Sequence, residues 1–306
     1  MLTGKRKIKK ILITGGSGFV GKNIIHQLKN RRYLKIYNLS KDPFENIKNV
    51  KNLFCDALTY DFSELNTQFD YIINLLALSN EKYCDDFLLA EKINIDFTKK
   101  VLDFARSQKK LRKFIHMSSI IIYNSKNNPP VKENAELHLN YTTYSFTKGI
   151  SEQYVKYYQD KFKIPALIFR LSNIYGPYQE YRDSPFLVPS KIFEALKGEE
   201  IKVLSLKPKR DWIFSEDAAR AIVKGLNSGC EGIYNLASGR GISVKDIMKE
   251  ISNQMHVSYK SLDKKTTGPS NFYCDISKIK KDLNWSPKTN LTDGIKKTIA
   301  YIRKNK

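Results

Sequence analysis

The chain has 306 residues, of which 41% are hydrophobic, and a formal net charge of +22. A chain of this length buries about three quarters of its unfolded surface, as one large domain or two lobes, without disulfide or metal support. Its apolar content excludes a disordered protein, and no apolar run reaches the roughly 18 residues that a membrane span requires.

The cysteines and the N-terminal segment indicate where the protein resides. The four cysteines lie far apart and form no CxxC pair or Cys/His cluster, which is typical of free thiols in a reducing compartment and gives no basis for a metal site. The basic segment Met1–Lys10 precedes an apolar run, Ile11–Ile13, that is too short for a signal peptide. We therefore expect a cytoplasmic protein without a metal.

The positive charge raises the question of a nucleic-acid partner. The chain contains 42 lysines and 11 arginines, and the lysines are spread along its whole length. Proteins that read bases and phosphates rely on the bidentate fork of arginine. The pattern therefore indicates a solvated, lysine-rich surface and no nucleic-acid partner, although its field would attract an anionic substrate such as a nucleotide phosphate.

Short apolar runs alternate with amphipathic stretches through residues 1–171. The runs with strand character are Lys10–Thr14, Lys35–Leu39, Leu53–Cys55, Tyr71–Leu76, Phe114–Ser118 and Ala166–Leu171. Helical periodicity is clearest over Val20–Asn30, Asp86–Ser107 and Thr142–Phe162. This alternation predicts an α/β fold, a Rossmann-type doubly wound parallel sheet with helices on both faces.

The pattern changes after Arg170, where prolines interrupt the chain and helices mix with short strands. We expect residues 1–171 to form the first domain and residues 172–306 to form a smaller mixed α/β lobe. The segment Trp212–Asn227 has helical character, and we expect it to return to the first domain.

A glycine-rich turn follows the first predicted strand and opens the first predicted helix. Gly15 permits the tight turn, Gly18 lets the backbone approach a pyrophosphate, and Gly21 lets the helix pack close to the sheet. Backbone N–H groups at the helix start, including those of Phe19 and Val20, would hold the phosphate charge. Because the strand and helix flank the turn as this motif requires, the sequence predicts a dinucleotide site.

The end of the second predicted strand bears on the choice of cofactor. An acidic residue there would bind the ribose 2′-hydroxyl of NAD, but the strand is followed by Ser40 and Lys41. A hydroxyl and a cation suit a 2′-phosphate, so this reading predicts NADP. If the strand runs further, Asp42 takes the acidic position and NAD is possible.

A Tyr-x-x-x-Lys pattern marks the candidate catalytic pair. Three such pairs exist, Tyr37/Lys41, Tyr144/Lys148 and Tyr157/Lys161, but only Tyr144/Lys148 opens a helix that follows the fifth predicted strand. A spacing of four puts both side chains on one helix face. The ammonium is expected to lower the tyrosine pKa, so that the tyrosine exchanges a proton with a sugar or alcohol hydroxyl. Ser119, just beyond another strand, would hold the same oxygen.

With these motifs the chain resembles the extended short-chain dehydrogenase/reductase superfamily, in its NAD(P)-dependent nucleotide-sugar epimerase/dehydratase branch. The matching motifs run from about Lys10 to the C-terminus. They are Thr14–Gly21, Asp56, Asn74–Ala77, Asn94 with Thr98, Ser118-Ser119 with Tyr123, Tyr144/Lys148, Arg170, Asn173–Pro177, Arg210–Ile213 with Asp217, Tyr234–Leu236 and Leu283–Pro287.

The resemblance implies roles for individual residues. It makes Ser119, Tyr144 and Lys148 a catalytic triad, and it assigns Asn173 and Arg210 to the diphosphate of a nucleotide-sugar substrate. The other residues that it places around the cofactor are Asp56 and Ala57 at the adenine end, and Leu75, Ala77, Asn94, Ser118 and Arg170. The other residues that it places around the substrate are Ser79, Val188 and Lys265.

Two departures from the family pattern narrow the function. Family 4,6-dehydratases carry an Asp-Glu acid/base pair directly after the catalytic Ser/Thr, whereas this chain has Ile120-Ile121, which cannot transfer protons. The family's second substrate-phosphate arginine is also missing, and Lys265 stands in its neighbourhood without the bidentate geometry of arginine. Because of the two isoleucines, a 4,6-dehydratase is not expected.

Two enzymatic readings remain, and we favour NADPH-dependent reduction of a 4-keto nucleotide sugar over a 4-epimerase with bound NAD. A non-catalytic, cofactor-sensing protein on the same fold is the alternative outside enzymology. The resemblance also implies a homodimer built by the helices Asp86–Ser107 and Thr142–Phe162. The apolar residues at helical spacing that suggest this interface are Phe97, Val101, Phe104, Tyr154, Val155 and Tyr158.

Overall fold

The computed structural model describes residues 8–182, 184–266 and 268–306, which divide into two compact units. The first unit holds Met1–Ile122, Leu139–Phe169 and Ile222–Ile233. The second holds Tyr123–His138, Arg170–Ala221 and Tyr234–Lys306. Each unit is thus built from separate stretches of chain. The sequence predicted one boundary after residue 171, with a return of Trp212–Asn227 to the first domain. Most of the basic N-terminal segment lies outside the described residues.

A large β-sheet organises the first unit, with the strand order β10-β6-β5-β4-β1-β2-β3. Its strands are β1 (Lys9–Thr14), β2 (Leu34–Ser40), β3 (Val50–Phe54), β4 (Tyr71–Asn74), β5 (Lys113–Ser119), β6 (Ala166–Leu171) and β10 (Gly232–Leu236). Strands β1 to β5 pair in parallel, and the strand order reverses beside β1, which is where ligands bind in such sheets. The predicted doubly wound α/β fold is confirmed.

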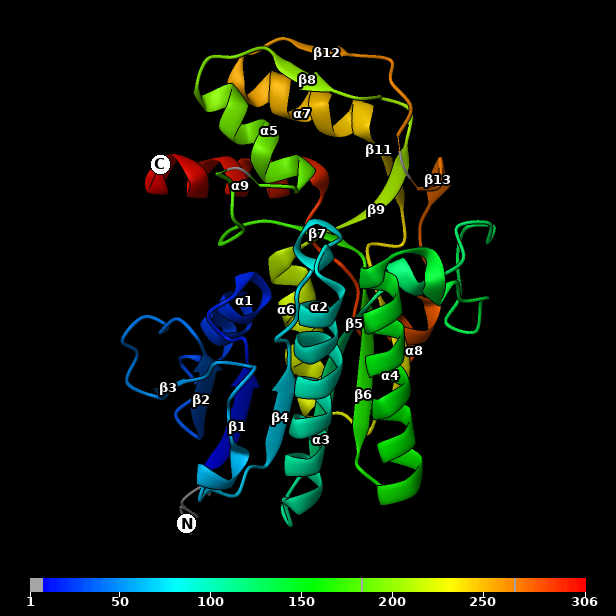
Figure 1. Ribbon diagram of the computed structural model, residues 1–306. Helices are drawn as coiled ribbons and strands as arrows, with labels where there is room; N and C mark the ends of the chain where they lie inside the picture. The colour runs from blue at the N-terminus through cyan, green and yellow to red at the C-terminus, as the bar shows by residue number, and fades with distance from the viewer. Residues whose placement is uncertain (1–7, 183, 267) are drawn as a thin grey trace. The chain divides into compact units, whose positions relative to one another are not determined.

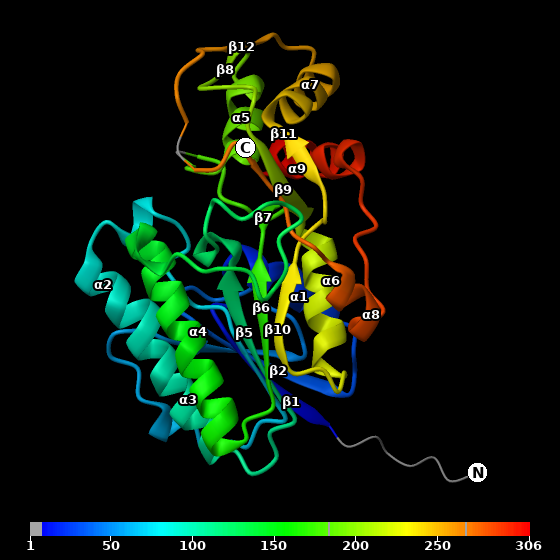
Figure 2. The same cartoon turned by 90° about the vertical axis from the view of Figure 1, so that its right-hand side faces the viewer.

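Helices cover both faces of this sheet, as Figures 1 and 2 show, with α3 and α4 on one face and α1 on the other. The helices of this unit are α1 (Phe19–Leu28), α2 (Phe87–Glu91), α3 (Phe97–Ser107) and α4 (Thr143–Phe162), with a π-helical turn at Lys92–Asp96. Helix α6 (Ser215–Leu226) begins in the second unit and ends in the first. A capping box starts α4, because Thr142 Oγ1 accepts from Ser145 N and Ser145 Oγ accepts from Thr142 N.

The apolar residues that suggested a dimer interface pack inside the first unit. Phe97, Val101 and Phe104 of α3 and Val155 of α4 belong to its buried core, and Tyr154 and Tyr158 pack against that core. Because these side chains are already used for packing within the unit, they give no support to an interface. The homodimer stays a prediction.

The second unit contains a four-stranded sheet, in which β9 pairs with β7, β11 and β13, and a two-stranded sheet of β8 and β12. Its strands are β7 (Asn173–Tyr175), β8 (Ile201–Val203), β9 (Lys209–Phe214), β11 (Gly241–Ser243), β12 (Tyr259–Ser261) and β13 (Asn271–Phe272). Its helices are α5 (Leu187–Leu196), α7 (Val244–Met255), α8 (Ser277–Leu283) and α9 (Leu291–Asn305). Ile192, Ile247 and Ile299 are among the residues of its core.

The predicted helix over Trp212–Asn227 is wrong at its start. Trp212, Ile213 and Phe214 end strand β9 and pair with β7, because large aromatic and β-branched side chains pack well on a pleated surface. The helix begins only at Ser215, and Glu216 and Asp217 stand in its first turn, where acidic residues suit the positive end of the helix dipole.

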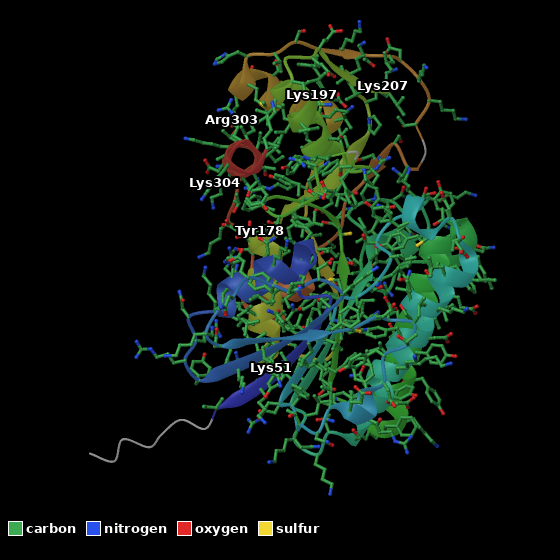
Figure 3. All side chains as sticks on the ribbon, turned by 60° about the vertical axis from the view of Figure 1, so that its left-hand side comes forward. Lys51, Tyr178, Lys197, Lys207, Arg303 and Lys304 are labelled. Atoms are coloured by element: carbon green, nitrogen blue, oxygen red, sulfur yellow. The ribbon has the colours of Figure 1, made fainter. Side chains whose placement is uncertain are left out.

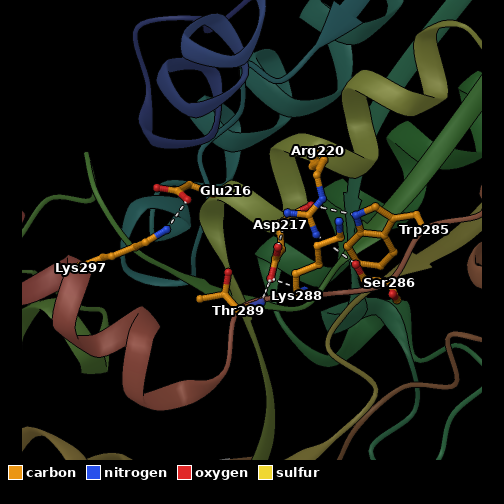
Figure 4. Close-up of polar contacts among 8 residues, drawn as sticks. All are labelled: Glu216, Asp217, Arg220, Trp285, Ser286, Lys288, Thr289 and Lys297. Carbon is orange, nitrogen blue, oxygen red and sulfur yellow. Dashed lines mark hydrogen bonds and ion pairs between the residues drawn. The ribbon is translucent and has the colours of Figure 1, made fainter.

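A buried carboxylate fixes the start of α6 in the second unit (Figure 4). Asp217 is fully buried, and its Oδ1 lies 2.5 Å from Arg220 Nη1. Its Oδ2 accepts from the backbone N–H groups of Lys288 and Thr289 at 3.0 and 2.8 Å. The indole Nε1 of Trp285 donates to the Asp217 carbonyl. The Leu283–Pro287 motif therefore serves to anchor the chain before α9 onto α6.

Replacing Asp217 by alanine should lower the free energy of unfolding by about 2–4 kcal/mol, because it orphans two backbone donors and one arginine. Lys297→Ala is the matched control: it removes the neighbouring pair with Glu216, whose side chains are 49% and 44% exposed, and should cost less than about 1 kcal/mol. Urea unfolding followed by circular dichroism measures both. Equal losses for the two variants would contradict the structural role of Asp217.

Many basic residues lie on the surface of both units. Figure 3 labels Lys51 of β3 together with Lys197, Lys207, Arg303 and Lys304, all of which are exposed. This placement agrees with a lysine-rich, solvated surface. Among the described residues, no helix combines the length and the apolar character of a membrane span.

Candidate active site

The glycine turn sits where β1 ends and α1 begins. Gly15 has a φ of +71°, and a Cβ there would lie 3.0 Å from the backbone of Leu76, the segment after β4. A Cβ on Gly21 would lie 2.5 Å from Gly16. Gly18 is the N-cap of α1, and no described side chain caps this helix. Its first N–H groups are thus free of a side-chain cap, and the turn fits a pyrophosphate.

The structure changes the role of Ser40. This residue ends β2 and is buried; its Oγ donates to Asn38 Oδ1 at 2.9 Å and accepts from Ser17 N at 3.2 Å. Asn38 Nδ2 in turn donates to Ser17 Oγ at 2.8 Å. The hydroxyl predicted to bind a 2′-phosphate therefore holds the glycine turn, because the strand runs one residue further than expected.

Lys41 and Asp42 follow β2 and are both exposed. Ser17 Oγ donates to the backbone carbonyl of Asp42 at 2.5 Å, which ties this pair to the glycine turn. Strand β2 runs further than the sequence predicted, and in that case Asp42 is expected to take the acidic position that binds the ribose of NAD.

Ser119, Tyr144 and Lys148 come together in the first unit. Ser119 ends β5, and its hydroxyl hydrogen-bonds with the side chain of Tyr144, which lies in the first turn of α4. Lys148, one turn further along α4, is buried and donates from Nζ to the carbonyl of Met117 on β5 at 2.5 Å. The helix thus carries the tyrosine and the lysine to the carboxyl end of β5.

Burial dominates the ionisation of this group. It raises the pKa of Tyr144 to about 12, against the hydrogen bond from Ser119 that lowers it. It also lowers the pKa of Lys148 to about 8, although the charges of Glu152 and Cys84 act in the opposite direction. The expected depression of the tyrosine pKa is therefore wrong, because the desolvation cost of burying Tyr144 outweighs the effect of the Ser119 hydrogen bond.

One polar atom at this edge is available to a ligand. Ser118 is 2% exposed, and its Oγ has no hydrogen-bond partner among the described residues. Buried hydroxyls in native proteins are nearly always paired. An unpaired one beside Ser119, together with the uncapped start of α1, fits a bound dinucleotide.

Other residues that the resemblance places around the cofactor lie in the segments after β3 and β4 and in the π-helical turn. Asp56 accepts from Leu58 N within the turn after β3, and Ala57 lies beside it, partly buried. Leu75 and Ala77 are partly buried in the segment after β4. Asn94 is buried, and it bonds both the backbone of Leu78 and the hydroxyl of Thr147, so its amide holds the loop after β4 to α4.

Arg170 is buried in the second unit. It donates from Nη1 to the carbonyl of Glu133 at 2.8 Å and lies 4.8 Å from the centre of the Tyr123 ring. These contacts assign its side chain to packing in that unit. A contact of Arg170 with the cofactor stays a prediction.

The residues assigned to the substrate fall in both units. Ser79 is exposed after β4 in the first unit. The others belong to the second unit and are Asn173 on β7, Val188 on α5, Arg210 on β9 and the exposed Lys265. Val188 is 1% exposed and belongs to the core of that unit, so packing accounts for its side chain. Arg210 is partly exposed, and its Nη1 donates to the carbonyl of Lys209 at 3.0 Å.

Two buried polar residues of the sheet were not predicted from the sequence as part of the site. Asn38 on β2 and His116 on β5 interrupt apolar strands, and a polar residue within such a run was the signal available. Both are at most 2% exposed and hydrogen-bonded.

Comparisons with known proteins show what the chain is similar to. The chain is 27% identical to a putative UDP-glucose 4-epimerase of Methanocaldococcus jannaschii, over 96% of this chain and 99% of that protein. It is 27% identical over 97% of its length to a trifunctional UDP-glucose 4,6-dehydratase/UDP-4-keto-6-deoxy-D-glucose 3,5-epimerase/UDP-4-keto-L-rhamnose-reductase of Arabidopsis thaliana, and it spans about half (47%) of that relative's length.

The chain is also similar to a solved structure and matches the model of a protein family. The crystal structure of UDP-glucuronic acid 4-epimerase from Bacillus cereus, in complex with UDP-glucuronic acid and NAD, matches with a TM-score of 0.88. It covers 97% of this chain and 100% of that one at 24% identity, which shows the shared fold. The model of the NAD dependent epimerase/dehydratase family matches residues 11–237. The chain therefore belongs to the NAD dependent epimerase/dehydratase family.

Proposed function

We propose that the protein carries out hydride chemistry at C4 of a nucleotide-linked hexose, as a 4-epimerase that uses NAD. The observation that carries this proposal is the group formed by Ser119, Tyr144 and Lys148 in the unit that also holds the glycine turn. Two hydroxyls that share a hydrogen bond beside a buried amine are suited to moving a proton on and off a sugar hydroxyl.

Each residue has a role in this reaction. The turn Gly15–Gly21 would hold the pyrophosphate, and NAD, when bound, would supply a nicotinamide able to exchange a hydride with the sugar. Tyr144 takes the proton from the C4 hydroxyl and returns it, while Ser119 holds the same oxygen. Lys148, fixed against the Met117 carbonyl, places its positive charge near Tyr144 and favours the ionised tyrosine.

The end of β2 supports NAD. Since Ser40 is engaged with the glycine turn, its hydroxyl is committed to the protein. Asp42, exposed and tied to Ser17 through its backbone, is the acidic group that would bind a ribose 2′-hydroxyl. An epimerase regenerates its cofactor within each cycle, so we expect NAD to be tightly retained.

NADPH-dependent reduction of a 4-keto nucleotide sugar is the second candidate, and Lys41 favours it. This lysine is exposed directly after β2 and suits a 2′-phosphate. A 4,6-dehydratase is disfavoured, because Ile120 and Ile121 follow Ser119 and offer no proton-transferring group. The free state of the cysteines agrees with the cytoplasmic location that we expect.

Tyr144→Phe should reduce turnover by about 10²–10⁴-fold, because it removes the proton-transferring hydroxyl. The assay incubates the protein and NAD with UDP-glucose, UDP-N-acetylglucosamine and UDP-glucuronic acid in turn and separates the 4-epimers by chromatography. Tyr157→Phe is the matched control, since Tyr157 lies on the same helix and is 56% exposed. Turnover by Tyr144→Phe equal to that of the control would contradict the proposal.

Asp42→Ala should weaken NAD binding about 10- to 150-fold, which corresponds to the loss of a charged hydrogen bond of about 1.5–3 kcal/mol. NAD and NADPH titrations of the native protein and the variant measure this. Asp160→Ala, an exposed carboxylate at the other end of α4, should change nothing. If the native protein prefers NADPH and Lys41→Ala removes that preference, the reductase takes the place of the epimerase.

Arg210 is the residue that we propose for the substrate diphosphate, since arginine can grip two phosphate oxygens at once. Arg210→Ala should weaken binding of UDP about 10- to 150-fold while leaving NAD affinity unchanged. Arg303→Ala, exposed on α9, is the control. Unchanged UDP affinity would remove Arg210 from the substrate site, and a loss of NAD binding would assign it to the other ligand.

A further inference from the structure

A row of buried polar side chains crosses the sheet of the first unit. Thr14 of β1, Asn74 of β4 and His116 of β5 are register partners on neighbouring strands. Register partners project from the same face of a sheet. Ser151 of α4 continues the row, and all four residues are at most 2% exposed. A polar row in this position is costly unless every group is paired.

Hydrogen bonds link the row from end to end. Thr14 Oγ1 lies 2.7 Å from Asn74 Oδ1, and Asn74 Nδ2 lies 3.3 Å from His116 Nδ1. His116 Nε2 lies 3.4 Å from Ser151 Oγ, which donates to the carbonyl of Lys148 at 2.9 Å. The row thus starts at the residue before the glycine turn and ends at the backbone of the candidate catalytic lysine.

The hydrogen-bond partners of the row determine which atom donates and which accepts in each of its bonds. The N–H groups of Leu75 and Leu76 donate to Thr14 Oγ1, so the Thr14 proton is directed to Asn74 Oδ1. The nitrogen of the Asn74 amide, Nδ2, is therefore the donor to the next groups. Thr98 Oγ1 receives one of its protons, because its own hydroxyl donates to the Asn94 carbonyl.

His116 is left with one possible protonation state. Its Nδ1 accepts from Asn74 Nδ2, so its proton is on Nε2 and points to Ser151 Oγ. A second proton would oppose the Asn74 amide donor and add a charge close to Lys148. Burial first, and then the charge of Lys148, hold the pKa of His116 well below its usual range.

We infer that His116 is a positioning residue for Lys148: as a permanently neutral Nε2–H imidazole, it joins the start of the glycine turn to the helix that carries Tyr144 and Lys148. The hydrogen-bond row on which this rests is independent of the reaction. Its consequence for catalysis rests on the proposed function above.

The first test reads the histidine directly. The full chain, labelled with ¹⁵N in its four histidines, is titrated from pH 5 to 8 by long-range ¹H–¹⁵N correlation, and His116→Phe assigns the resonance. We expect His116 to remain neutral with its proton on Nε2 throughout. A proton on Nδ1, or titration of His116 near pH 6.5, would overturn the inference.

The second test separates positioning from stability. Ser151→Ala and His116→Phe should each lower kcat, up to about 100-fold for a misplacement on the ångström scale, with little change in the KM of the UDP-hexose that is turned over. Gln108→Leu is the control, since Gln108 is a buried residue of the same unit whose side chain accepts from Phe69 N, outside the row. It should lower thermal stability without lowering kcat.

The outcomes distinguish this inference from the proposed function. If Tyr144→Phe abolishes turnover while Ser151→Ala and a folded His116→Phe keep the native kcat, the positioning role is overturned and the proposed function stands. If Tyr144→Phe is fully active, the proposed function fails, and the protonation state of His116 is still decided by the ¹⁵N titration of the native chain.

Discussion

The buried hydrogen bond between Thr14 and Asn74, 2.7 Å long, is the contact on which the candidate site depends. It joins β1 to β4 where the strand order reverses, at the carboxyl edge that opens to ligands. The same hydroxyl accepts from the backbone of Leu75 and Leu76. That backbone lies so close to Gly15 that only a glycine fits there. The shape of the phosphate turn therefore follows from how two strand ends are tied together.

Burial, more than charge, sets the chemistry of the catalytic group. The surface carries most of a net charge of +22, yet Lys148 is buried and its pKa falls to about 8. Burial raises the pKa of Tyr144 to about 12, so the tyrosine is neutral before ligands bind. Ionisation of Tyr144 during the reaction then requires that the bound substrate and cofactor change this environment, because desolvation opposes the charge of the tyrosinate.

The second unit uses buried carboxylates as structural anchors. Asp211, next to Arg210, is fully buried and accepts from the backbone N–H groups of Ser238, Gly239 and Cys274. Asp217 does the same for the chain before α9. Backbone donors compensate part of the cost of burying a carboxylate. In both cases a residue of a recognisable motif holds the fold, so a motif match alone does not identify a ligand contact.

The sequence by itself determined the local features. Strand and helix periodicity predicted the doubly wound sheet, and the glycine spacing and the Tyr144/Lys148 pair could be located because each depends on residues close together in the chain. Only the tertiary structure decided what depends on distant segments. Partners far away in the sequence decide whether Ser40 faces a ligand or the glycine turn and whether Trp212 ends a strand or starts a helix. They also decide whether Val188 and Arg170 are buried. The protonation state of His116 is of the same kind, since it is set by β4 and α4 together, and no single stretch of sequence contains both.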